Sequence, residues 1–99
     1  MTSDHFNGLT PGEAERLAFL AEEMGEALQA VGKILRHGYE SQDPTMPPGL
    51  TNRQQLEQEL GDVRCAMIML CDVEDLSKDS IHDRAKAKME IVLRWMHHQ

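Results

Sequence analysis

Apolar side chains recur between residues 11 and 37 at steps of three and four, the spacing of one face of an α-helix. Thr10, Pro11 and Glu13 match a capping box with proline at the first helical position, and Gly38 supplies a stop. The pattern predicts a helix from Pro11 to about residue 37, with its apolar stripe facing a core. That stripe consists of Leu17, Leu20, Ala21, Met24, Leu28, Val31 and Leu35.

Two more helices are expected after residue 51. Thr51 and Gln54 repeat the capping signal of a helix that ends near Asp72. A turn over Glu74–Ser77 then precedes a third helix that runs to about Met96. Nothing alternates with period two, so the fold is expected to be all-α, with three long helices and possibly a short extra one. The expected core positions are Leu56, Leu60, Val63, Met67 and Leu70 of the second helix and Ile81, Ala85, Val92 and Trp95 of the third.

Residues 38–51 form the one long interruption in this pattern. They contain three prolines, Pro44, Pro47 and Pro48, and carry no apolar period. A loop of this length in a small domain is often functional. We therefore expect residues 38–51 to act as a lid over a site. Residues 1–10 are expected to be a flexible N-terminus.

The chain of 99 residues is expected to form one small domain, residues 1–99, that buries only a modest core. Self-association is therefore expected. The formal net charge of -7 argues against binding to nucleic acid or to an anionic membrane surface. No apolar run approaches the ~20 residues of a membrane span. No export signal is visible, and two cysteines without a pairing pattern suit a reducing compartment. The expected location is the cytoplasm.

Two acidic motifs carry the candidate chemistry, Glu22-Glu23-Met24-Gly25-Glu26 and Glu59-Leu60-Gly61-Asp62. Each places two carboxylates three residues apart on an expected helix, so that they project from neighbouring parts of one face. Like charges held so close repel each other, and a hard cation between the two pairs would explain them. All the donors are oxygens, which fits Mg²⁺, with Mn²⁺ possible, better than zinc or a di-iron centre.

Helical phase leaves a second interpretation open. Glu22, Glu23 and Glu26 lie about 140–240° round the first helix from its apolar stripe, where solvated glutamates are commonly found. Glu59 and Asp62 lie at the border of the second stripe, where clefts between helices form. From periodicity alone, the first motif is more typical of a solvent-exposed surface than of a site.

The order Glu23-x-x-Glu26 followed by Glu59-x-x-Asp62 resembles the MazG-like family of all-α nucleoside triphosphate pyrophosphohydrolases, over roughly residues 14–96. The resemblance implies hydrolysis of an NTP or dNTP between the α- and β-phosphates, giving a monophosphate and pyrophosphate. It implies Mg²⁺ held by these four carboxylates, with Glu22 as a general base or outer partner.

Substrate contacts need cations and a stacking surface. Lys33 lies one to two turns beyond Glu26 on the same side of the first helix and is the first phosphate candidate, with an ordinary solvated lysine as the alternative. The resemblance adds Lys86, Lys88 and Arg94, since basic residues are common in the family's third helix. Tyr39 is a candidate for stacking on the base.

The resemblance also implies assembly into a dimer or tetramer. If the carboxylates bind metal opposite the apolar stripe, the first helix must be covered on both sides, and a partner subunit could complete the bundle. Two other functions stay open: a catalytically silent helical dimer acting as an interaction or regulatory module, and a metal-dependent hydrolase of another phosphoanhydride.

Overall fold

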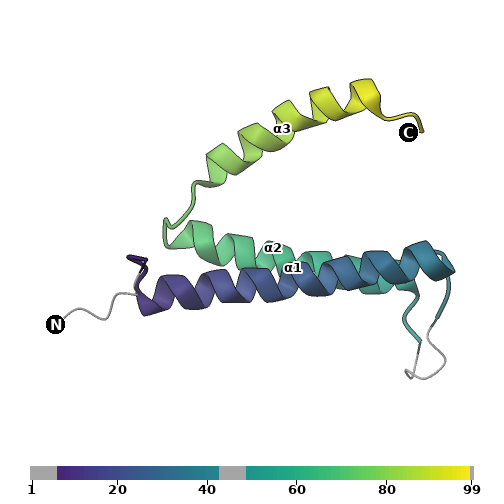
Figure 1. The fold of residues 1–99 in the computed structure, drawn as a ribbon, viewed down its shortest axis with the longest axis horizontal. Coiled ribbons are helices and arrows are strands. Elements are labelled where there is room, and N and C mark those ends of the chain that lie inside the picture. Colours follow the sequence, from purple (N-terminus) through teal and green to yellow (C-terminus); the bar gives the residue numbers. More distant parts are fainter. Residues whose placement is uncertain (1–6, 43–48, 99) are drawn as a thin grey trace.

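The protein contains three helices, α1 (Pro11–His37), α2 (Asn52–Asp72) and α3 (Lys78–Trp95), as Figure 1 shows. This computed structural model describes residues 7–42 and 49–98, and no strand is present within those ranges. The expected all-α fold is therefore confirmed. The predicted flexibility of residues 1–6 and the centre of the predicted lid, residues 43–48, lie outside the described residues.

The helix ends follow from local sequence signals. Oγ1 of Thr10 accepts a hydrogen bond from the Glu13 N–H at 3.1 Å, and the Glu13 carboxylate accepts one from the Thr10 N–H at 2.8 Å. Thr51 and Gln54 form the same reciprocal pair at the start of α2. At the other end of α1, Gly38 has φ 87°, a conformation that favours glycine. The predicted helix limits are confirmed. They could be predicted because each cap depends only on residues close to it in the sequence.

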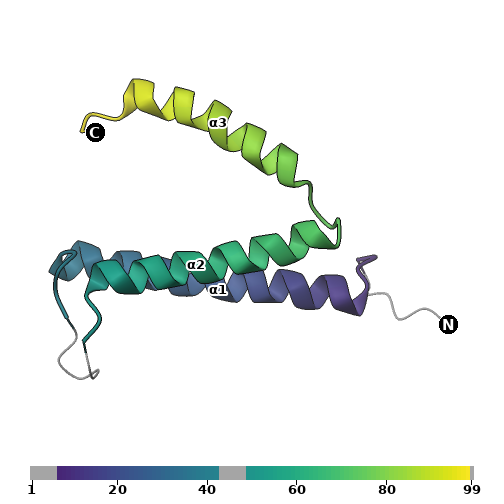
Figure 2. The same cartoon turned by 180° about the vertical axis from the view of Figure 1, so that it is seen from behind.

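Helices α1 and α2 lie side by side and run in opposite directions (Figures 1 and 2). Small side chains dominate the buried part of this pair, with Ala27 and Ala30 on α1 and Ala66 on α2. Leu70 is the large side chain buried most completely, with 0% exposed. Alanines allow two helix backbones to approach closely, so this contact is narrow and contains few large apolar groups.

The expected orientation of α1 is wrong. Its buried residues are Glu23, Ala27 and Ala30, whereas Leu28 and Leu35 of the predicted core stripe are 71% and 81% exposed. The carboxylate side lies away from the predicted stripe, and the metal hypothesis required another helix or subunit to cover it; α2 of the same chain covers it. An amphipathic pattern marks an apolar face but does not say which partner covers it, and here the alanine side of α1 takes up the intramolecular contact.

The expected inward side of α3 is also exposed. α3 leaves the α1–α2 pair at an angle and packs along neither helix (Figures 1 and 2). Ala85 is exposed and Trp95 is 58% exposed, while Ile81 and Val92 are half-buried. Leu60 of the second predicted stripe is 52% exposed as well. Within one chain, therefore, the three helices do not form a closed bundle.

Polar contacts fix both ends of the α1–α2 pair. At one end, Nε of Arg16 donates to the Asp75 carboxylate at 2.7 Å, which ties α1 to the turn before α3. At the other end, Nδ2 of the buried Asn52 donates to the Gly38 carbonyl at 3.1 Å. The Asn52 N–H also donates to the Ser41 carbonyl at 2.9 Å. These contacts at both ends fix how α1 and α2 are aligned along each other.

We expect Asn52→Ala to lower the free energy of unfolding by about 1–2 kcal/mol, because it leaves the Gly38 carbonyl without its side-chain donor. Urea unfolding followed by circular dichroism measures this loss. Gln58→Ala, at an exposed position of the same helix, serves as the control. A loss no larger than that of the control would show that this contact does not stabilise the pair.

Candidate metal centre

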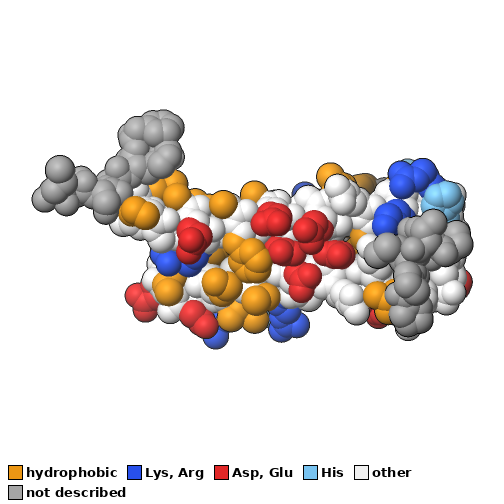
Figure 3. Space-filling model, turned by 90° about the horizontal axis from the view of Figure 1, so that it is seen from below, with side chains coloured by type: hydrophobic (Ala, Val, Ile, Leu, Met, Phe, Trp, Pro, Cys, Tyr) orange, Lys and Arg blue, Asp and Glu red, His pale blue; other side chains and the backbone are white. Residues whose placement is uncertain are grey.

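Four carboxylates meet where α1 and α2 pack. Glu23 and Glu26 come from α1, and Glu59 and Asp62 come from α2. One oxygen from each of these four residues lies within 4.8 Å of the corresponding oxygens of the others. Figure 3 shows acidic side chains gathered near the middle of the face of the α1–α2 pair that points away from α3. The structure thus brings together the four residues that the sequence predicts as metal ligands.

Two carboxylate oxygens of this cluster are buried and have no hydrogen-bond partner. Glu23 is only 9% exposed, and its Oε2 atom is buried without a hydrogen-bond partner. Oε2 of Glu59 is buried and unpartnered in the same way. A buried oxygen of this kind is costly unless something satisfies it. A divalent cation with a preference for oxygen would satisfy both atoms at once, so the donor set fits a hard metal ion.

The electrostatics of the cluster agree with this geometry. Burial raises the pKa of Glu23, and the charges of Glu26, Asp62, Glu22 and Glu59 raise it further. Burial also raises the pKa of Glu59, followed by its hydrogen bond with the Glu26 carboxyl and by the charges of Glu26 and Asp62. Both groups therefore resist ionisation while no cation is present.

Two further predicted site residues lie close to the cluster. Lys33 is half-buried on α1, and its positive charge lowers the pKa of Glu59 against the larger opposing effects. Glu22 is exposed, and its negative charge contributes to the raised pKa of Glu23. The exposure of Glu22 leaves its carboxylate accessible to water beside Glu23.

The other predicted substrate contacts are not brought to the cluster within one chain. Lys86, Lys88 and Arg94 are exposed on α3, which rises from the side of the pair opposite the acidic face (Figures 1 and 3).

Tyr39 lies beyond the end of α1, where the Arg53 guanidinium is 4.2 Å from the centre of its ring. Arg53 could not be found from the sequence, because no spacing signal links residues on either side of a long loop.

A family model described as the MazG nucleotide pyrophosphohydrolase domain matches residues 12–95. The match spans all three helices and both acidic motifs. No curated protein and no solved structure was found to match the chain. Among the described residues, no helix is both long enough and apolar enough to cross a membrane.

The raised pKa values predict how stability depends on pH. A carboxyl group whose pKa is higher in the folded than in the unfolded state stabilises the fold at low pH, and this contribution is lost as pH rises through the folded pKa. For Glu23 and Glu59, metal-free protein in EDTA should therefore have a lower Tm near neutral pH than at about pH 5. Glu23→Gln should flatten this dependence, and an equally steep profile in the variant would contradict the assignment.

Divalent metal should offset the repulsion within the cluster. At about ten times its Kd, Mg²⁺ or Mn²⁺ should raise the Tm of the wild type at neutral pH by roughly 5–10 °C. Glu23→Gln should abolish this rise and also raise the Tm in EDTA, because it removes one buried charge. Differential scanning fluorimetry in a Ca²⁺-free buffer measures both effects. The control replaces the divalent metal with K⁺ at matched ionic strength. A wild type that does not respond to either metal would exclude the site.

Proposed function

Because this chain belongs to the MazG nucleotide pyrophosphohydrolase family, we propose that it hydrolyses a nucleoside triphosphate between the α- and β-phosphates. The products are a nucleoside monophosphate and pyrophosphate. One observation carries this proposal: two buried, unpartnered carboxylate oxygens lie in a cluster of four acidic residues in the region that the family model covers.

In this proposal Glu23, Glu26, Glu59 and Asp62 hold Mg²⁺, with Mn²⁺ as a possible substitute. Four carboxylates and a triphosphate repel one another strongly, so the substrate binds only when cations lie between them. When bound, Mg²⁺ neutralises phosphate charge and lowers the pKa of a coordinated water. Glu23 and Glu59 fix the position of the ion because their side chains are held between packed helices.

Glu22 and Lys33 have complementary roles in the proposed reaction. Glu22 is exposed beside Glu23 and accepts a proton from the attacking water as a general base. Lys33 provides positive charge on the same side of α1 and binds a phosphate oxygen. Two charge effects support these roles: Glu22 raises the pKa of Glu23, and Lys33 lowers the pKa of Glu59 against larger opposing effects.

The contacts to the rest of the substrate depend on assembly. We infer that the enzyme acts as a dimer or tetramer, in which Lys86, Lys88 and Arg94 of one copy approach the acidic face of another. Tyr39 is 50% exposed, and stacking of a base on it would use the ring face opposite Arg53. In such an assembly, the cations of α3 could bind phosphate although α3 projects away from the cluster of its own chain.

The exposed apolar side chains of α1 and α3 would suit equally well a helical dimer that acts only as an interaction module. The unpartnered oxygens of Glu23 and Glu59 favour the enzyme, because a purely structural helix pair gains nothing from burying them.

A panel of NTPs and dNTPs incubated with the protein and Mg²⁺ tests the proposed activity by pyrophosphate release and by identification of the monophosphate. Glu59→Gln should lower kcat/KM at least ~100-fold, as expected when a group that stabilises transition-state charge is removed. Glu57→Gln is the matched control, since Glu57 is an exposed glutamate two residues away on α2.

The absence of pyrophosphate release with either metal would reject the hydrolase. Full activity in Glu59→Gln, or an equal loss in Glu57→Gln, would reject the role of Glu59 in the site. Release of inorganic phosphate in place of pyrophosphate would instead indicate cleavage at another phosphoanhydride bond.

A further inference from the structure

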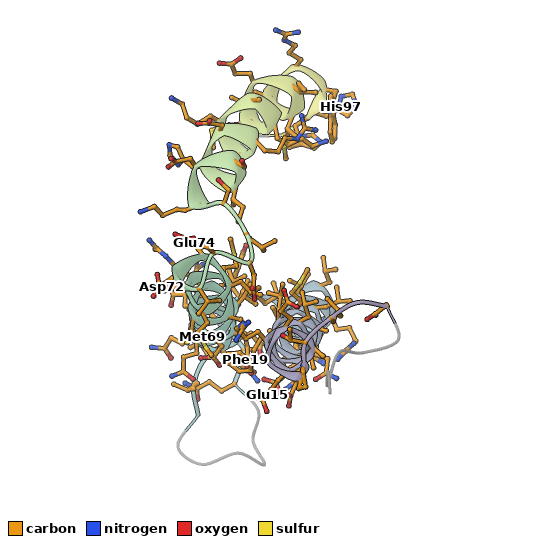
Figure 4. All side chains as sticks on the ribbon, turned by 90° about the vertical axis from the view of Figure 1, so that its left-hand side faces the viewer. Glu15, Phe19, Met69, Asp72, Glu74 and His97 are labelled. Carbon is orange, nitrogen blue, oxygen red and sulfur yellow. The ribbon has the colours of Figure 1, made fainter. Side chains whose placement is uncertain are left out.

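A short turn joins α3 to the α1–α2 pair. No residue of α3 is buried, and α3 packs along neither of the other helices. In Figure 4, Glu74 lies between α2 and α3, and His97 lies beyond the far end of α3, away from the other two helices. Because so little of α3 touches the pair, its direction depends mainly on the residues between Asp72 and Lys78.

This turn has a defined but unfavourable backbone geometry. Glu74 has φ 64°, a left-handed conformation that favours glycine. Its N–H donates to the Cys71 carbonyl at 3.0 Å, and the Asp75 N–H donates to the Leu70 carbonyl at 3.0 Å. These two bonds are those of a Schellman motif at the end of a helix. Since a glutamate is strained in this conformation, contacts from outside the turn must help to maintain it.

The ion pair between Arg16 and Asp75 provides such a contact. Nε of Arg16 donates to one carboxylate oxygen at 2.7 Å, and Nη2 donates to the other at 3.4 Å. Two hydrogen bonds to one carboxylate fix its orientation as well as its distance. The two side chains are only 26% and 17% exposed, so solvent screens their attraction less than that of a surface pair. Within the part of the chain that the structure describes, no other ion pair joins α1 to residues 73–98.

The surroundings of the pair keep the Arg16 guanidinium in place. A Cβ atom added at Gly12 would lie only 3.2 Å from Nη1 of Arg16, so the glycine leaves the space that the guanidinium occupies. Apolar side chains dominate the hollow beside Asp75, and they strengthen the attraction because they lower the local dielectric constant. That hollow is lined by Leu9, Glu13, Leu17, Leu70, Asp75 and Leu76.

The length of α3 magnifies any change at the turn. At about 1.5 Å per residue, Lys86 lies about 12 Å along α3 from Lys78, and Arg94 lies about 24 Å from it. A tilt of roughly 10° at the turn would move these two residues by about 2 Å and about 4 Å. A hydrogen bond to a phosphate oxygen does not tolerate such displacements. Cations on α3 can therefore hold a phosphate only if the turn itself is held.

We propose that Arg16 and Asp75 are positioning residues, which hold the turn against α1 and thereby fix the direction of α3. They do not touch the substrate and act through the cations that α3 carries, Lys86, Lys88 and Arg94. The effect on the substrate rests on the proposed function, whereas the effect on the direction of α3 does not.

Pulsed electron paramagnetic resonance tests the direction of α3. Spin labels at Gln58→Cys and Glu90→Cys, two exposed positions, report the distance between α2 and α3 in a background of Cys65→Ser and Cys71→Ser. An excess of unlabelled protein suppresses distances between copies. The distance distribution should be narrow in this parent and at least ~2-fold broader once Asp75→Asn releases the turn.

Two further variants show whether Arg16 and Asp75 act as one pair. Arg16→Gln should broaden the distribution as Asp75→Asn does, and the double variant should be no broader than either. Asp83→Asn removes the same charge from an exposed position of α3 and should leave the width unchanged. Circular dichroism should show the same helix content in all variants. A broad distribution in the parent, or an unchanged width in both single variants, would overturn the proposal.

Steady-state kinetics with the nucleotide that the enzyme hydrolyses tests the consequence for the substrate. Asp75→Asn should raise KM at least ~5-fold and leave kcat within ~2-fold, because the acidic cluster is untouched. Asp83→Asn should change neither constant. An unchanged KM, or a loss confined to kcat, would overturn the effect on substrate binding. If the wild type hydrolyses no nucleotide, the proposed function fails, and the measured distances still decide whether the pair positions α3.

Discussion

The mutual repulsion of four carboxylates between two packed helices is the constraint around which this molecule is arranged. Ala27, Ala30 and Ala66 let α1 and α2 approach closely, and this closeness forces the oxygens of the cluster together. Contacts at both ends of the pair, through Arg16 and Asn52, oppose the tendency of the charges to separate the helices. A cation between these carboxylates would convert their repulsion into an attraction.

This constraint also explains why the apolar surface lies where it does. A helix face that carries Glu23 and Glu26 cannot also carry a large apolar core, so the side of α1 that packs on α2 contributes mainly alanine. Leu28, Leu35 and the other bulky residues are displaced to a different side of the helix. A chain that devotes its intramolecular contact to a charged site therefore has to find its apolar contacts elsewhere.

The sequence predicts those features that depend on near neighbours. The capping pairs at Thr10 and Thr51 gave the helix limits correctly, and the three-residue spacing of acidic side chains identified the four that meet. It failed for the face of α1 that packs on α2, since two faces of that helix are suited to burial and only the three-dimensional contact selects one. The contact of Arg53 with Tyr39 joins residues on either side of a loop, and no periodic pattern in the sequence indicates it.

The way the loop between α1 and α2 begins and ends has a consequence for how such a domain diversifies. Gln42 pairs with Thr51, and the Arg53 N–H bonds to the Tyr39 carbonyl at 2.8 Å, so the chain is closed on both sides of residues 43–48. The closure entropy of a loop grows slowly with its length once its ends are held. Segments of different length and composition can therefore be exchanged at this point at little entropic cost and without moving Glu26 or Glu59.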